Sequence, residues 1–128
     1  GAKVSAAAAL RDLTDGDAIN KAAIREAGGI PALIQLLKTG SSGAKVSAAG
    51  ALRDLATGNM ANKEAIHEAG GIPVLVELIR SGTFGAKEAA AAAIRDLADG
   101  DCVNKAAIRD ADGIPVLVDL IKNGMPGA

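Results

Sequence analysis

The sequence predicts an all-α protein built from repeats of three helices each. Three observations support this fold class. The chain repeats itself every 42 residues, its apolar residues follow helical rather than alternating spacing, and glycine and proline recur at equivalent points. Residues 1–42 and 43–84 are identical at 26 positions, and no insertion breaks the register. We therefore expect a single domain over residues 1–128, with repeats at 1–42, 43–84 and 85–126.

Each repeat opens with an Ala-rich stretch that we expect to form a long helix, ending at Gly16 in the first repeat. Its apolar positions recur at helical spacing, so Ala6, Leu10 and Leu13 are predicted to face the core. A short helix should follow over 18–27. Asp17 is a good N-cap for this helix, and the paired glycines at 28–29 stop it.

The next helix of the repeat, which starts near Pro31, is predicted to turn an apolar face toward the core. Pro31 suits its first turn, and Gly40 ends it shortly after Lys38. Its apolar residues follow the i, i+3, i+4, i+7 pattern of a buried helix face. The predicted core positions in the three repeats are Ile30, Leu33, Ile34 and Leu37; Ile72, Leu75, Val76 and Ile79; and Ile114, Leu117, Val118 and Ile121, with Ile24, Ile66 and Ile108 from the short helices.

Residues 20–37 resemble the first two helices of an armadillo repeat, and residues 48–56 resemble its third. The signature A-G-x-I-P-x-L recurs at the 42-residue period, with Asp112 replacing its glycine in the third repeat. The short helix between glycines favours armadillo over HEAT repeats, because it makes three segments per unit. The resemblance implies a right-handed armadillo-type α-solenoid whose Ala-rich third helices line a concave groove. Such a groove would bind a protein or an extended peptide.

Polar residues recur at one phase of the Ala-rich helix, and we take them as the candidate groove. They are Ser5, Arg11, Asp12 and Asp15; Ser47, Arg53, Asp54 and Thr57; and Arg95, Asp96 and Asp99. In peptide-binding armadillo proteins such as importin alpha, this stripe carries a tryptophan and an asparagine. By resemblance, the tryptophan positions here hold Ala8, Gly50 and Ala92, and the asparagine positions hold aspartate. An ionised aspartate only accepts hydrogen bonds, so it cannot hold a peptide amide as asparagine does.

Two interpretations of the repeated Arg-Asp pairs follow from the sequence. They could form a charged groove for an extended partner with alternating charges. Alternatively, the arginine of one repeat pairs with the aspartate of its neighbour and sets the register of the stack, a contact worth only about 0–1 kcal/mol if exposed.

Composition narrows the function classes further. The chain has 14 basic and 15 acidic residues, a formal charge of −1, which argues against nucleic-acid or membrane partners. One cysteine, Cys102, allows no internal disulfide and fits the cytoplasm or another reducing compartment. It replaces Ala18 and Met60, which predicts an inert packing position. His67 falls in no metal or catalytic pattern, so we expect neither a cofactor nor an enzyme.

The two ends of the chain predict self-association. The chain starts with a long helix and stops after a second helix, and both ends keep the apolar residues of the internal repeats. Gly127 and Ala128 reach the register at which Gly1 and Ala2 begin. Solenoids normally cover their ends with polar repeats, but both ends are apolar here. We therefore expect the two ends to stack head-to-tail. The alternative to a binding scaffold is an engineered or excised structural array with no specific ligand.

Overall fold

The computed structural model describes residues 1–123, which form nine α-helices and no strand. The long helices are α1 (Ala2–Thr14), α4 (Ser42–Ala56) and α7 (Phe84–Ala98). The short helices are α2 (Ala18–Glu26), α5 (Met60–Glu68) and α8 (Cys102–Asp110). The second helices are α3 (Gly29–Thr39), α6 (Gly71–Ser81) and α9 (Gly113–Asn123). The all-α prediction with three helices per repeat is confirmed; the predicted return to register at residues 127–128 lies outside the described residues.

Capping side chains and residues with left-handed backbone determine where the short helices begin and end. The side chain of Asp17 accepts a hydrogen bond of 3.0 Å from the backbone N–H of Asn20, and Asn59 and Asp101 cap their short helices in the same way. Left-handed backbone follows each short helix, at Gly28, Gly70 and Asp112. Asp112 adopts φ +64° without the freedom of glycine, yet the turn is kept.

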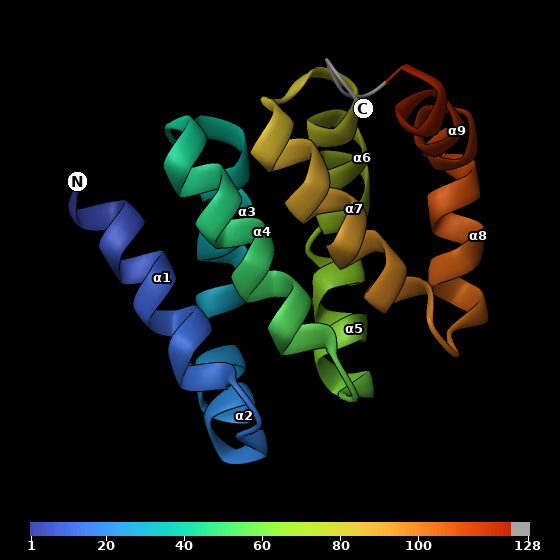
Figure 1. Ribbon diagram of the computed structural model, residues 1–128. Coiled ribbons are helices and arrows are strands. Elements are labelled where there is room, and N and C mark those ends of the chain that lie inside the picture. The colour runs from blue at the N-terminus through green and yellow to red at the C-terminus, as the bar shows by residue number, and fades with distance from the viewer. Residues whose placement is uncertain (124–128) are drawn as a thin grey trace.

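The helices stack into the α-solenoid that the resemblance implied. Figure 1 shows α1, α4 and α7 side by side and running in the same direction, with α3 and α6 behind α4 and α7, and with α8 and α9 at the red end of the stack. Helix α4 packs against both α1 and α7, while α6 packs against α3 and α9. Equivalent helices therefore lie next to one another along the stack, and the structure extends by repeating one interface.

The middle of the stack contains the best-buried side chains. Leu52, Leu55, Ile66, Ile72 and Leu75 are completely buried, as the periodicity predicted. Burying such side chains stabilises the fold by about 1.5–3 kcal/mol each. The core is aliphatic and thin, because alanines bring the long helices close together: Ala48, Ala49 and Ala51 have no exposed surface.

At the two ends the predicted core is wrong in part. Ala6 and Leu13 of α1 are exposed, as are Ile114, Val118 and Ile121 of α9. Leu10 and Leu117 are half-buried. Their equivalents in the middle repeat are buried, because that repeat packs between two described repeats, whereas each of the other two packs against one. A periodic sequence assigns the same environment to equivalent residues, whereas burial depends on the place of the repeat in the stack.

Candidate binding face

The candidate groove residues lie on the three long helices or at their C-terminal caps, and those helices form one face of the molecule (Figure 1). We call this surface the long-helix face. Its first-repeat residues Ser5, Arg11, Asp12 and Asp15 are exposed. In the middle repeat Ser47, Arg53 and Asp54 are half-buried and Thr57 is exposed, and in the third repeat Asp96 is half-buried while Arg95 and Asp99 are exposed.

Arginine and aspartate of neighbouring repeats lie together on this face. Arg11 Nε is 3.9 Å from Asp54 Oδ2, and Arg53 Nε is 3.5 Å from Asp96 Oδ2. The Thr57 hydroxyl donates a hydrogen bond of 2.8 Å to the same Asp96 oxygen. Arginine of one repeat thus lies beside aspartate of the next at both interfaces, the arrangement that the second interpretation of these pairs expects.

A second carboxylate, that of Asp15, acts on Asp54, whereas the equivalent position near Asp96 holds the neutral Thr57. Partial burial raises the pKa of the Asp54 carboxyl above its ordinary value of 3.8, while the charges of Arg53 and Arg11 oppose the rise. The Asp15 carboxylate adds to the rise through like-charge repulsion. At the next interface the residue equivalent to Asp15 is Thr57, which donates a hydrogen bond instead.

The raised pKa predicts how stability depends on pH. A group with a higher pKa in the folded chain binds its proton more tightly there, so its contribution to stability is lost as pH rises through the folded pKa. The variant Asp54→Asn removes this titration. We expect its stability relative to the parent to increase from pH 3 to pH 7, measured by urea unfolding. A relative loss of stability over that range would show that pairing with Arg11 outweighs burial.

The short helices provide a second set of contacts between repeats, which the sequence interpretation missed. Lys21 Nζ donates a hydrogen bond of 2.9 Å to the Thr57 carbonyl. Lys63 Nζ is equivalent and donates one of 2.7 Å to the Asp99 carbonyl. Each lysine therefore caps the C-terminus of the long helix in the following repeat, where the carbonyls lack partners within the helix.

Asn62 is completely buried and joins three helices. Its Nδ2 donates a hydrogen bond of 2.9 Å to the Leu55 carbonyl of α4, and its Oδ1 accepts one of 2.7 Å from Arg25 Nη1 of α2. Asn20 and Asn104 repeat the bond to the long helix of their own repeat. The missed signal was the Asn-Lys pair, identical in all three repeats at 20–21, 62–63 and 104–105.

Within residues 1–123, the cationic contacts between repeats all run in one direction along the chain. In each, the arginine or lysine belongs to the earlier repeat and the oxygen to the later one. These cationic residues are Arg11, Lys21, Arg25, Arg53 and Lys63. The one neutral contact in the opposite direction, from Asn62 Nδ2 to the Lys21 carbonyl, is long at 3.4 Å. The stack consequently has a direction: cationic side chains point toward the following repeat, and the oxygens that they contact belong to that repeat.

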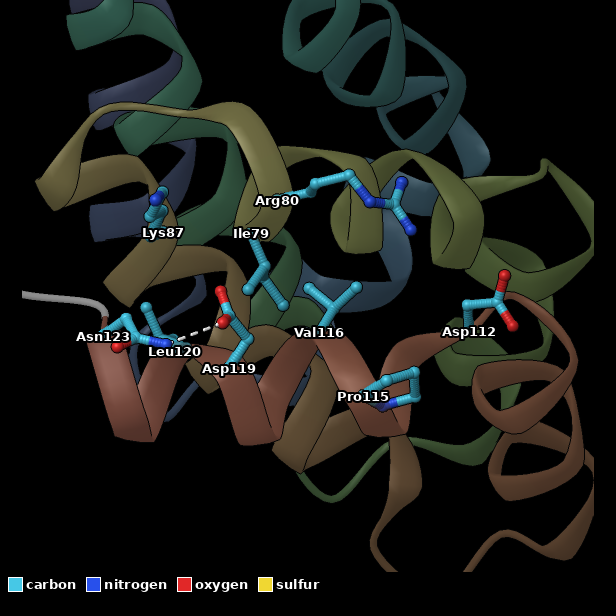
Figure 2. Close-up of a pocket in the computed structure, with 9 residues that line it drawn as sticks. All are labelled: Ile79, Arg80, Lys87, Asp112, Pro115, Val116, Asp119, Leu120 and Asn123. Carbon is cyan, nitrogen blue, oxygen red and sulfur yellow. Dashed lines mark hydrogen bonds between the residues drawn. The ribbon is translucent and has the colours of Figure 1, made fainter.

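A hollow of about 360 Å³ lies where α6, α7 and α9 meet. Figure 2 shows Lys87 and Arg80 on one side and Asp119, bonded to Asn123, on the other. The equivalent residues of α3, α4 and α6 line a similar hollow, which includes Leu37, Lys45 and Val74. Because such a hollow recurs with the repeat and is lined by side chains of both charges, we interpret it as part of the interface between repeats. We call it a seam hollow.

Other candidate chemistry finds little support in residues 1–123. No cluster of three potential metal ligands occurs there. Among the described helices, none has the length and apolar character to cross a membrane. The prediction that Cys102 occupies a packing position is wrong: Cys102, Met60 and Ala18 are all exposed, because the first residue of each short helix points away from the contacts between repeats.

Comparison with known proteins identifies the repeat. The profile of the Armadillo/beta-catenin-like repeat matches residues 17–57 and 59–99, each a short, a second and a long helix. No curated protein matches the chain. Two crystal structures of engineered proteins, both targets of the Northeast Structural Genomics Consortium, are similar. One has a TM-score of 0.90 and 37% identity over 94% of this chain and 49% of its own. The other has a TM-score of 0.87 and 29% identity over 91% of this chain and 48% of its own.

This chain thus spans about half the length of those two proteins. Armadillo repeats are non-enzymatic scaffolds that generally bind proteins. In this chain α1 precedes the two matched units, and α8 and α9 follow them. From its helix order, its stacking and the matched residues, we conclude that the chain belongs to the armadillo repeat family and is an α-solenoid repeat scaffold.

Proposed function

We propose that the chain is a non-enzymatic scaffold that binds an extended protein segment along the long-helix face. The observation that carries the proposal is the alignment of α1, α4 and α7 side by side (Figure 1). An extended ligand crossing these helices would meet the same positions in each repeat. Backbone and side chains of the ligand could then contact a surface that repeats in step with it.

Charge, rather than an aromatic platform, would select this ligand. The positions for tryptophan hold Ala8, Gly50 and Ala92, and the Arg11 side chain lies over Gly50, with its Cδ and Nε 3.2 Å from where a Cβ would be. Carboxylates and guanidinium groups alternate across the face, and much of this charge is accessible: the Arg95 side chain is 81% exposed. We therefore expect a segment of alternating lysine and glutamate as the best ligand.

Fluorescence anisotropy with a labelled peptide of alternating lysine and glutamate tests the proposal. Changing Asp12, Asp54 and Asp96 together to alanine should weaken binding at least several-fold and flatten its dependence on salt. The matched control changes Glu26, Glu68 and Asp110 to alanine. It removes the same charge from exposed, equivalent positions on the short helices and should leave binding nearly unchanged. Equal affinity of the parent and the aspartate variant would overturn the proposal.

A second candidate function is an engineered structural array that has no specific ligand. Two observations favour it: the near-identity of the repeats, and the similarity to structures of engineered proteins. The arginine–aspartate pairs would then serve the stack alone, and the exposed apolar ends would lead to head-to-tail association. Absence of peptide binding together with self-association would favour this candidate over the first.

A further inference from the structure

An exposed apolar side chain lies at one end of the stack, and an apolar hollow lies at the other. Ile121 of α9 is 85% exposed, whereas its equivalents Leu37 and Ile79 are 2% exposed. Leu37 and Ile79 each form one wall of a seam hollow. At the other end, α1 and α3 line an equivalent hollow of about 350 Å³ that is mainly apolar and has no such wall. Its lining includes Ala6 and Leu36.

We propose that a second copy of the chain occupies this hollow, with α9 of one copy seated against α1 and α3 of the next in the register of the internal repeats. This inference specifies the self-association of the second candidate function and does not require peptide binding. Ile121 would take the place that Leu37 and Ile79 hold inside the chain. Its side chain and Ala6 of the next copy would both become buried, as Ala48 and Ala90 are.

Polar groups at the two ends match in the same register. The last repeat presents Arg95, Lys105 and Arg109, and their equivalents Arg53, Lys63 and Arg25 each contact the following repeat. The first repeat presents Asp12, the Asp15 carbonyl and the Asn20 Oδ1, whose equivalents are the oxygens in those three contacts. By equivalence with Arg53–Asp96, Lys63–Asp99 and Arg25–Asn62, these three cations meet these three oxygens.

The polarity of these contacts selects one kind of assembly. Pairing two C-terminal ends would bring the cations of both copies together, which is repulsive. Pairing a C-terminal end with an N-terminal end satisfies the donors and buries the apolar residues. Because such a contact is heterologous, each added copy presents the same two surfaces to the next one.

Sedimentation velocity over a dilution series tests the inference with three variants. Ala6→Glu blocks the N-terminal hollow and Ile121→Glu blocks the C-terminal wall. Val103→Glu is the control, because Val103 is 63% exposed and its equivalents Ile19 and Ala61 are exposed in every repeat. The parent and the control should grow in mass with concentration, whereas each end variant alone should remain monomeric.

An equimolar mixture of the two end variants is the decisive sample. Each retains one functional end, so the mixture should form dimers and nothing larger. A parent that stays monomeric at all concentrations, a mixture that stays monomeric, or an end variant that dimerises by itself would overturn the inference. Circular dichroism confirms that the variants are folded. The peptide assay, performed at dilute concentration, reports independently on the long-helix face.

Discussion

Replacing Asn62 by alanine is expected to lower the free energy of unfolding by about 2–4 kcal/mol. The side chain is completely buried, and its amide is the hydrogen-bond partner of the Leu55 carbonyl and of the Arg25 guanidinium. Alanine would leave a buried carbonyl without its donor, and a cation without its acceptor. The loss at the buried Leu55 carbonyl includes the cost of an unsatisfied polar group in addition to the bond itself, whereas water can reach the half-buried Arg25.

Asn20 is the matched control, because it occupies the same position in the first repeat. Its Nδ2 makes the equivalent hydrogen bond to the Leu13 carbonyl, but this bond is exposed to solvent. Water can replace it, so Asn20→Ala should cost about 0.5–1.5 kcal/mol. Urea unfolding of both variants measures the difference. Equal losses would mean that the contact with Arg25 and the burial of Asn62 contribute nothing.

Helix existence and boundaries were predictable because local residues determine them. Glycines at 28 and 70 adopt left-handed backbone, and Asp17 caps the next helix through its own side chain. Pro31 lies in the first turn of α3, two residues after its start, where its missing N–H costs nothing. These signals act within a few residues, so a single sequence is enough to identify them.

Contacts between repeats were only partly predictable. Arg53 is next to Asp54 in sequence, yet its Nε lies 3.5 Å from Asp96 of the following repeat. Sequence adjacency could not decide between a free charged groove and pairs that set register, and both interpretations stayed open. Asn62 was harder to identify, because a polar residue on a short helix is usually solvated; only its three-fold recurrence pointed to a structural role.

Stacking and binding draw on the same side chains of the long-helix face. Asp54 and Asp96 interact with arginines of the preceding repeat. A ligand that recruits the internal aspartates must compete with these ion pairs. Both pairs are partly exposed, with arginine side chains 49% and 43% exposed, so we expect about 1 kcal/mol or less from each and a weak competition. The proposed binding of a charged segment to this face is therefore compatible with stacking.

Position in the stack, more than residue type, determines how much each side chain contributes to the free energy of unfolding. Leu55 and Leu13 test it most directly, because they are equivalent residues that are 0% and 52% exposed. Urea unfolding at dilute concentration compares Leu55→Ala with Leu13→Ala. We predict a loss of about 2–5 kcal/mol for the buried leucine and of about 1 kcal/mol or less for the exposed one. Equal losses at the two positions would contradict the account.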